Sequence, residues 1–272
     1  MKDYKIFFFH LDSLIVTNHV TFPYTNEVIH LLKKQSKKVY FLTNQLDRVT
    51  SIKKQLESFG LKVALNQIIT PMHAIQDYFS DRIKMVSLFI VGSDIIKEEM
   101  RKKGSHILAS STEKTKGEVY VILSLTNTLE IEELQDAFSL LQRGAKLIML
   151  NPNLNGPILN EILLESGSIG RVFTSEQPIS RLNINVMGKR SIWMQQVLLK
   201  LLHHQYGQAV MVSHSFTSHV AIGQALGIDT VLLTGDQTQE EVLNVKQKPT
   251  YTFSSLEEFY DELKGKELVE DQ

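Results

Sequence analysis

The sequence predicts an α/β protein built on a doubly wound parallel sheet, with a second α/β domain inserted into it. Short apolar runs alternate with segments whose apolar residues recur at helical spacing, which is typical of parallel strands joined by helices. The alternation starts afresh near residue 84 and resumes its first form near residue 184. Four of the strand-like runs end in polar clusters, and ligands bind at the carboxyl ends of the strands in such sheets.

The first stretch of the chain supplies the opening strands and helices of the core. The strands are apolar runs, and the helices carry an apolar stripe, the second of them ending at Gly60 in a C-cap position. In chain order, the predicted strands are residues 6–12, 37–45 and 67–70, and the predicted helices are residues 26–35, 51–60 and 72–82.

The rest of the chain divides into the insertion and a return to the core. In the insertion, strands 86–93, 119–125 and 145–153 are separated by helices 95–104 and 130–144. In the returning part, the predicted strands are residues 184–189, 209–215 and 229–233, and the predicted helices are residues 191–207 and 221–227. We therefore predict a core domain of residues 1–80 and 184–272 and an α/β cap domain of residues 81–183.

The composition narrows the class of protein. The 272 residues carry a formal net charge of −1, which gives no global attraction to nucleic acid or to an anionic membrane. The chain has no cysteine, which excludes disulfides and thiolate chemistry and suits a reducing compartment. No apolar run approaches the roughly 20 residues that a membrane helix needs. We expect a cytoplasmic protein that binds neither nucleic acid nor membrane.

The polar clusters at the strand ends hold the candidate site residues. They are the segments HLDS, LTNQ, MGKRS and VSHSFTSH, and each directly follows a buried strand in the predicted core. In chain order, the residues that can carry chemistry there are His10, Asp12, Thr43, Asn44, Lys189, His214 and His219.

The order and spacing of these four clusters resemble the four motifs of the haloacid dehalogenase superfamily of phosphatases. Further segments are similar to its NagD and p-nitrophenylphosphatase branch, whose members carry a large α/β cap on a Rossmann-like core. Those segments are NPNLNGP (151–157), SGSIG (166–170), ALGIDTVLLTGDQTQEE (225–241) and KPTYTFSSLEEF (248–259). The resemblance covers essentially the whole chain.

The resemblance implies a role for each strand end. In that family the first motif reads D-x-D-G-T, and its first Asp attacks a phosphoryl group while its second Asp acts as acid and base. His10 stands at the nucleophile position and Asp12 at the acid/base position. Phosphate binding falls to Thr43, Asn44 and Lys189. The cap loop, which helps to select the substrate in this family, contributes Asn153 and Asn155.

The chain departs from the family pattern at three carboxylate positions. His10, His214 and His219 stand where the motifs have Asp. The family implies a magnesium ion, but magnesium prefers oxygen ligands, and histidine cannot form an acyl phosphate. We therefore expect no efficient magnesium-dependent hydrolysis of phosphate esters and assign no cofactor with certainty.

Two interpretations of the histidines stay open. A site freed from selection drifts, and one base change converts Asp to His. Alternatively, His10, Asp12, His214 and His219 converge at the strand ends and form a ligand set for zinc, nickel or another transition metal. Drift alone does not favour the same replacement at three positions.

The predicted function is that of a degenerate phosphatase homologue, a pseudoenzyme that binds a phosphorylated small molecule or a phosphate anion between core and cap. The alternative is an active phosphomonoester hydrolase, of the sugar phosphate or p-nitrophenyl phosphate type, that uses the altered metal site. The resemblance also leaves open a homodimer paired through the cap.

Overall fold

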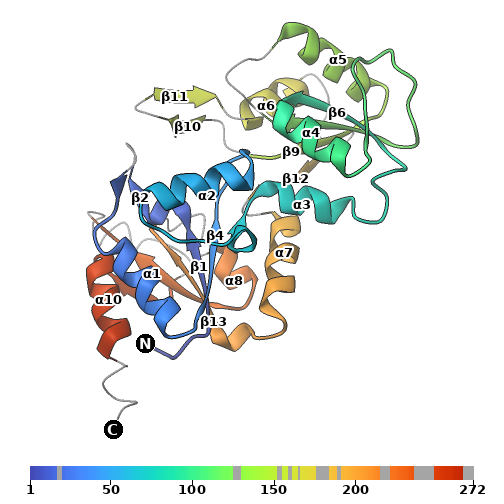
Figure 1. The fold of residues 1–272 in the computed structure, drawn as a ribbon. Helices are drawn as coiled ribbons and strands as arrows, with labels where there is room; N and C mark the ends of the chain where they lie inside the picture. Colours follow the sequence, from blue (N-terminus) through green and yellow to red (C-terminus); the bar gives the residue numbers. More distant parts are fainter. Residues whose placement is uncertain are drawn as a thin grey trace. The chain divides into compact units, whose positions relative to one another are not determined.

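The chain folds into two compact units in this computed structural model (Figure 1). The structure describes residues 1–16, 20–124, 130–151, 155–158, 161–164, 166–175, 184–188, 191–214, 221–235 and 248–265. The core unit comprises residues 1–43, 49–69 and 195–272, and the cap unit comprises residues 44–48 and 70–194. Each unit is built around its own parallel sheet.

The core unit contains a six-stranded parallel sheet in the order β15-β14-β13-β1-β4-β5. Chain connections run outward from β1 through β4 to β5, and outward on the other side through β13, β14 and β15, so the sheet is doubly wound as predicted. The reversal puts the switch point at β1 and β13, where such sheets bind ligands. The strands are β1 (Ile6–His10), β4 (Lys38–Leu42), β5 (Ile68–Ile69), β13 (Ala209–Ser213), β14 (Asp229–Leu233) and β15 (Tyr251–Phe253).

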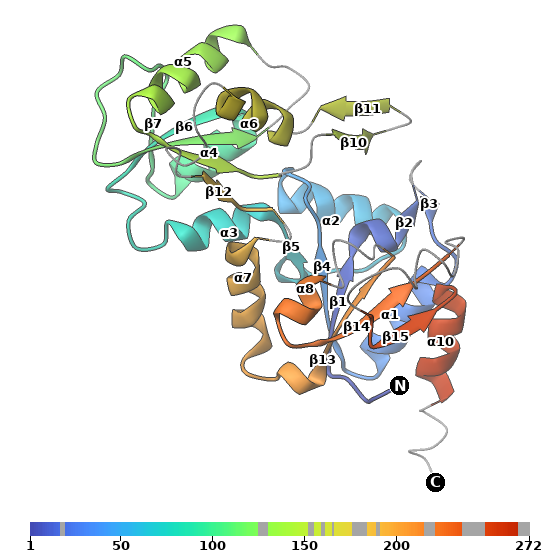
Figure 2. The ribbon, with the colours of Figure 1, turned by 180° about the vertical axis from the view of Figure 1, so that it is seen from behind.

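The face of the core sheet that carries Phe7 and Phe9 is covered by helices. Helix α1 (Thr25–Lys34) lies beside α10 (Leu256–Gly265) in both ribbon views (Figures 1 and 2). Both helices, together with α2 (Val49–Ser58), contribute apolar side chains to the cluster that buries the two phenylalanines. Because side chains alternate along a strand, Ile6, Phe8 and His10 face the opposite side.

Two further helices belong to the returning part of the chain. Helix α7 (Ile192–Leu202) precedes β13, and α8 (Ala221–Ala225) lies between β13 and β14 in the chain. Gly223 allows α8 to approach the sheet, because a Cβ atom at this position would overlap the Thr230 side chain and contact Met211.

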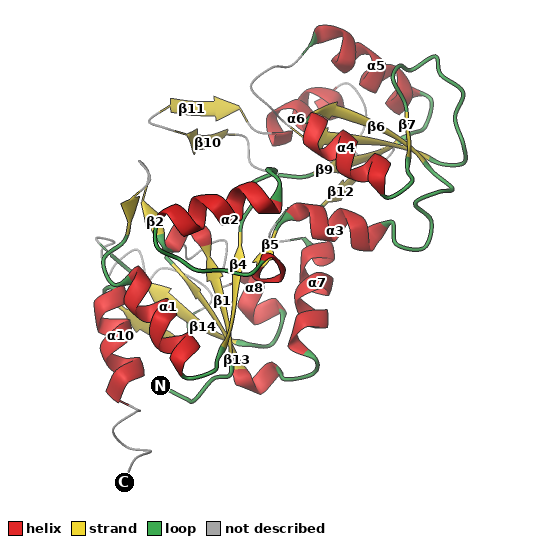
Figure 3. Ribbon diagram, viewed as in Figure 1, coloured by secondary structure: helices red, strands yellow, loops and turns green. Residues whose placement is uncertain are grey.

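The cap unit contains a five-stranded parallel sheet in the order β12-β9-β8-β6-β7, with helices beside it (Figure 3). Its strands are β6 (Ser87–Gly92), β7 (His106–Ile107), β8 (Val119–Ser124), β9 (Lys146–Met149) and β12 (Ile184–Val186). Its helices are α3 (Pro71–Tyr78), α4 (Asp94–Lys102), α5 (Ile131–Gln142) and α6 (Ser166–Ser175).

Two predicted details differ from the structure, and one further element has no counterpart in the prediction. Strand Ile184–Val186 pairs with β9 of the cap sheet, although the sequence pattern placed it in the core sheet. An antiparallel hairpin of β10 (Asn155–Ile158) and β11 (Glu161–Leu164) occupies part of the segment read as a cap loop. A second hairpin, of β2 (Ile15–Val16) and β3 (Val20–Thr21), follows β1 and was not predicted.

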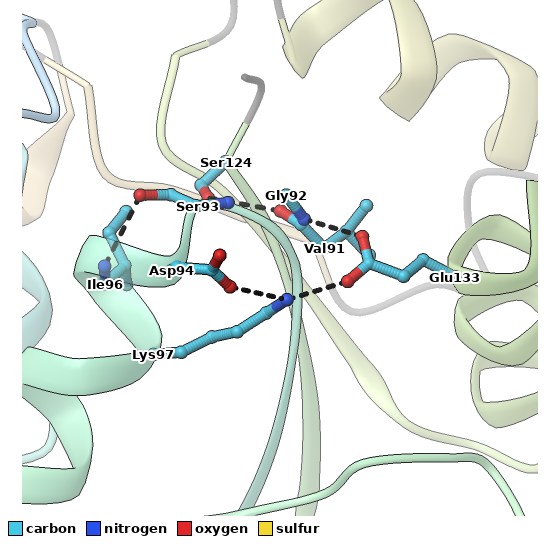
Figure 4. A network of polar contacts seen from close by, with 8 residues as sticks. All are labelled: Val91, Gly92, Ser93, Asp94, Ile96, Lys97, Ser124 and Glu133. Atoms are coloured by element: carbon cyan, nitrogen blue, oxygen red, sulfur yellow. Dashed lines mark hydrogen bonds and ion pairs between the residues drawn. The ribbon is translucent and has the colours of Figure 1, made fainter. Parts of the chain in front are cut away.

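A polar network fastens the carboxyl ends of β6 and β8 (Figure 4). The Ser124 hydroxyl donates to the carbonyl of Val91 at 3.1 Å and accepts the backbone N–H of Ser93 at 3.0 Å. Glu133 of α5 accepts the N–H of Gly92 at 3.0 Å and pairs with Lys97 at 2.7 Å. Burial opposes the charge of Lys97, but the bonds and charges of Glu133 and Asp94 outweigh it and raise the pKa of Lys97.

Across the part of the chain that the structure describes, we find no helix that combines the length and the apolar character needed to cross a lipid bilayer.

A substitution at Phe9 tests how much the buried core contributes to the free energy of unfolding. Its side chain is 0% exposed and contacts the rings of Phe7 and Phe259. We expect Phe9→Ala to lower the free energy of unfolding by about 3–5 kcal/mol, because it leaves a cavity in a packed interior. Urea denaturation followed by circular dichroism measures this change. Met85→Ala is the control, since Met85 is 67% exposed and its removal should shift stability by about 0.5 kcal/mol or less. If Phe9→Ala lowered the free energy of unfolding no more than Met85→Ala does, the assignment of Phe9 to the packed core would be wrong.

The start of α3 depends on a neutral histidine. The backbone N–H of Thr70 donates to Nδ1 of His73 at 3.2 Å, so the imidazole takes the place that Glu or Gln holds in a capping box. Burial lowers the pKa of His73 below its ordinary value of 6.5. The unfolded chain therefore binds this proton more readily than the folded chain does.

We expect the contribution of His73 to stability to be complete above about pH 6.5 and to be lost as the pH falls toward the lower folded-state pKa. His73→Gln keeps an acceptor at the cap without a titratable ring, so the difference in unfolding free energy between wild type and this variant should change with pH in the acid range. Urea denaturation at a series of pH values measures it. A difference that stays constant between neutral and acid pH would rule out this role.

Candidate functional site

His10 ends the central strand of the core sheet at its carboxyl edge. Its side chain is 2% exposed, and it pairs in register with Leu42 of β4. Thr43, the residue that follows β4, is also 2% exposed, and its backbone N–H donates to the carbonyl of Ile69 at 3.0 Å. The parallel pairing of β1 and β4 therefore places the first two predicted strand-end clusters side by side at the carboxyl edge of the sheet.

The chain leaves β1 through a tight turn that holds Asp12. Residues Leu11–Ser13 form one turn of 3-10 helix, closed by the Leu14 N–H donating to the Leu11 carbonyl at 2.9 Å. The carbonyl of Leu14 then accepts both the N–H of Phe22 at 3.0 Å and the hydroxyl of Thr25 at 3.1 Å. These bonds return the chain from the β2–β3 hairpin toward α1 and fix the turn.

His214 meets this turn from the other side of β1. Phe9 pairs with Val212 of β13, so the two residues that follow Val212 lie beside the end of β1. The Ser13 hydroxyl oxygen accepts the backbone N–H of His214 at 3.0 Å, and Nδ1 of the His214 ring lies 3.0 Å from the same oxygen. The Phe22 ring lies beside the imidazole, with 6.4 Å between the ring centroids.

The structure thus brings several predicted residues to one edge of the sheet. His10, Thr43 and His214 gather there, and Asn44 follows Thr43 directly. Asp12 lies on the turn by its backbone, and Asn155 lies in β10 by its backbone. The side chains of these last two, together with the predicted residues Asn153, Lys189 and His219, fall outside the described residues.

Ser13 is the residue that sequence reasoning did not assign to the site. It stands where the D-x-D-G-T pattern of the family has Gly. The signal that could have found it is that a buried serine at this position brings a hydroxyl to the strand ends, where a glycine brings none.

The donor atoms do not fit a magnesium ion. The two described residues at carboxylate positions of the pattern, His10 and His214, offer imidazole nitrogens, whereas magnesium requires oxygen ligands in near-ideal octahedral geometry. Within the described residues, no group of three or more His, Cys, Asp or Glu could hold a metal ion. His219 and the Asp12 side chain lie outside the described residues, and the transition-metal hypothesis stays a prediction.

The doubly wound sheet and the residues at its switch point define an α/β protein with a site at the carboxyl ends of β1, β4 and β13. Similarity to known proteins identifies the family of this chain. Residues 7–106 match the family model described as haloacid dehalogenase-like hydrolase, and residues 186–259 match one described as HAD-hydrolase-like. The chain belongs to the haloacid dehalogenase superfamily.

Its relatives and structural neighbours cover nearly the full chain. The chain is 23% identical to the 5′-nucleotidase YutF of Bacillus subtilis over 95% of its own length and 98% of that protein. A p-nitrophenyl phosphatase from Archaeoglobus fulgidus superposes with a TM-score of 0.82 at 25% identity, covering 96% of this chain and 100% of its own. NagD from E. coli K-12 superposes with a TM-score of 0.80 at 19% identity, covering 94% and 98%. The fold is therefore that of the NagD-type members, as the sequence predicted.

The mismatch with magnesium yields a binding prediction. We expect wild type to show no saturable heat of magnesium binding by titration calorimetry. The combined variant His10→Asp, His214→Asp and His219→Asp should bind magnesium at least about 10-fold more tightly, because it restores charged oxygen donors.

The control keeps the same kind of charge change away from the site. His203 and His204 are exposed in the turn after α7, so His203→Asp with His204→Asp should leave magnesium binding unchanged. Saturable magnesium binding by wild type, as tight as that of the combined variant, would contradict the prediction.

Proposed function

We propose that the chain binds a phosphate anion, or a small molecule through its phosphoryl group, at the carboxyl ends of β1, β4 and β13, and that it does not hydrolyse phosphate esters efficiently with magnesium. The observation that carries this proposal is the buried His10 imidazole at the end of β1, the position that the family resemblance gives to the nucleophile. An imidazole cannot form the family's acyl phosphate.

The charge at the strand ends supports anion binding. A nucleophilic carboxylate repels a phosphate dianion, and the family resemblance implies a cation that screens the two. Imidazoles at positions 10 and 214 are neutral or positive and need no such cation. Thr43 follows Leu42, the register partner of His10, and supplies a buried hydroxyl at the same edge of the sheet. Hydrogen bonds to charged groups are stronger than those between neutral groups.

The names of the relatives favour a second candidate. The p-nitrophenyl phosphatase of A. fulgidus and a sugar-phosphatase of B. subtilis are phosphatases by name, and another relative is named a 5′-nucleotidase. This chain would then hydrolyse phosphomonoesters with a transition metal held by His10, Asp12, His214 and His219, because imidazole suits zinc or nickel. The two candidates differ in turnover and in metal content.

Turnover of p-nitrophenyl phosphate separates the candidates. We expect wild type to give no magnesium-dependent turnover, and the combined variant His10→Asp, His214→Asp and His219→Asp to gain it, because carboxylates return to the nucleophile and metal positions. Turnover by wild type with magnesium, equal to or above that of the combined variant, would sink the proposal. Turnover with zinc or nickel in a protein that holds stoichiometric metal would favour the second candidate.

Binding of inorganic phosphate tests the positive half of the proposal. We expect titration calorimetry to show saturable phosphate binding by wild type. Thr43→Val removes the hydroxyl at nearly constant volume and should weaken binding by about 10-fold or more, whereas Thr43→Ser should retain most of it. Equal affinities for all three proteins would remove Thr43 from the site.

A further inference from the structure

The Ser13 hydroxyl links the turn after β1 to His214, 201 positions further along the chain. The oxygen receives the backbone N–H of His214 at 3.0 Å and lies 3.0 Å from the ring nitrogen Nδ1. Ser13 is 2% exposed, so both contacts are buried at the serine. Because both contacts of the Ser13 hydroxyl are with His214, they restrict the acceptor to which the hydroxyl can donate its hydrogen.

The donor and acceptor count identifies the tautomer of the ring. A serine hydroxyl has one hydrogen to donate and two lone pairs to accept with. One lone pair accepts the His214 backbone N–H, and a buried O–H is nearly always donated to an acceptor. Among the residues that the structure describes, the other polar contact of the Ser13 hydroxyl is with Nδ1 of His214. The hydroxyl therefore donates to Nδ1, which must carry a lone pair rather than a proton.

We propose that Ser13 fixes neutral His214 in the tautomer that carries its proton on Nε2, so that His214 acts as a hydrogen-bond donor to the phosphoryl oxygens bound at the strand ends. The inference rests on the proposed function for the identity of the acceptor. Ser13 is a positioning residue in this arrangement, and His214 is the group that contacts the anion.

The same tautomer disfavours a metal at His214. A nitrogen that ligates a metal must be unprotonated, but Nε2 carries the proton and Nδ1 accepts from Ser13. In metal sites, the ring nitrogen that does not bind the metal usually donates its N–H to a carboxylate, a carbonyl or water. Here that nitrogen accepts a hydrogen bond instead, which is the pattern expected for a histidine that donates through Nε2.

The surroundings of the ring help to preserve this orientation. The Phe22 ring is tilted by 45° to the imidazole, and the Phe22 backbone is fixed by its bond to the Leu14 carbonyl. A half-turn of the imidazole would exchange Nδ1 for a carbon atom at the Ser13 hydroxyl and break the bond. Ser13 stands where the family pattern has Gly, so the serine and the histidine are paired departures from it.

Nuclear magnetic resonance of protein with ¹⁵N-labelled histidine tests the tautomer directly. We expect the His214 ring, assigned by its loss in His214→Gln, to show a pyridine-type Nδ1 and a pyrrole-type Nε2 at pH 8. In Ser13→Ala, the ring should populate both tautomers, and affinity for inorganic phosphate should fall about 3- to 10-fold, the loss of roughly one hydrogen bond. Ser13→Thr retains the hydroxyl and should restore both readouts.

Ser124→Ala is the matched control. Ser124 is also a buried serine whose hydroxyl donates once and accepts one backbone N–H. Its removal should leave the His214 spectrum and the phosphate affinity unchanged.

The spectrum of wild type decides the assignment even if Ser13→Ala does not fold. A protonated Nδ1 in wild type overturns the inference, and so does an unchanged phosphate affinity in folded Ser13→Ala. If wild type shows the expected tautomer but binds no phosphate, the proposed function fails and the donor role of His214 fails with it.

Discussion

The parallel pairing of β1 with both β4 and β13 is the interaction on which the site depends. It sets Phe9 beside Phe41 on one side and Val212 on the other, so the residues that follow these three positions meet at one edge. Side chains alternate along a strand, and a slip of one residue would turn His10 to the opposite face. Backbone hydrogen bonds in the middle of the sheet therefore determine which side chains can cooperate at its end.

The core that enforces this pairing is separate from the groups that do the chemistry. Phe7 and Phe9 are buried against apolar residues of α1, α2 and α10, while His10 is the last residue of β1 and Thr43 and His214 follow β4 and β13. A substitution at position 10 or 214 would therefore alter the charge and the hydrogen-bonding groups of the edge without removing a side chain from this cluster. This separation allows members of one superfamily to share a fold while their sites differ.

Local patterns in the sequence predicted most of the fold, and they failed where the outcome depends on distant partners. Alternating apolar runs predicted the parallel strands of both units. The order of the motifs predicted that positions 10, 43 and 214 lie at one edge of the sheet. The short strand Ile184–Val186 was placed in the wrong sheet, because its residues read the same whether the partner is β9 or a core strand. The bond between Ser13 and His214 joins residues 201 positions apart, and no local pattern encodes such a contact.

The hydrogen bonds of Glu133 distinguish the switch point of the cap sheet from that of the core sheet. In the cap order, β7 lies on one side of β6, and β8, β9 and β12 lie on the other, so the cap has a strand reversal of its own between β6 and β8. At that reversal the Gly92 N–H, which a phosphate would use in a doubly wound sheet, already donates to a carboxylate of the same chain. An incoming anion there must compete with a tethered one that is further held by Lys97. The Glu133 carboxylate thus competes with any external anion for the Gly92 N–H at the switch point of the cap sheet.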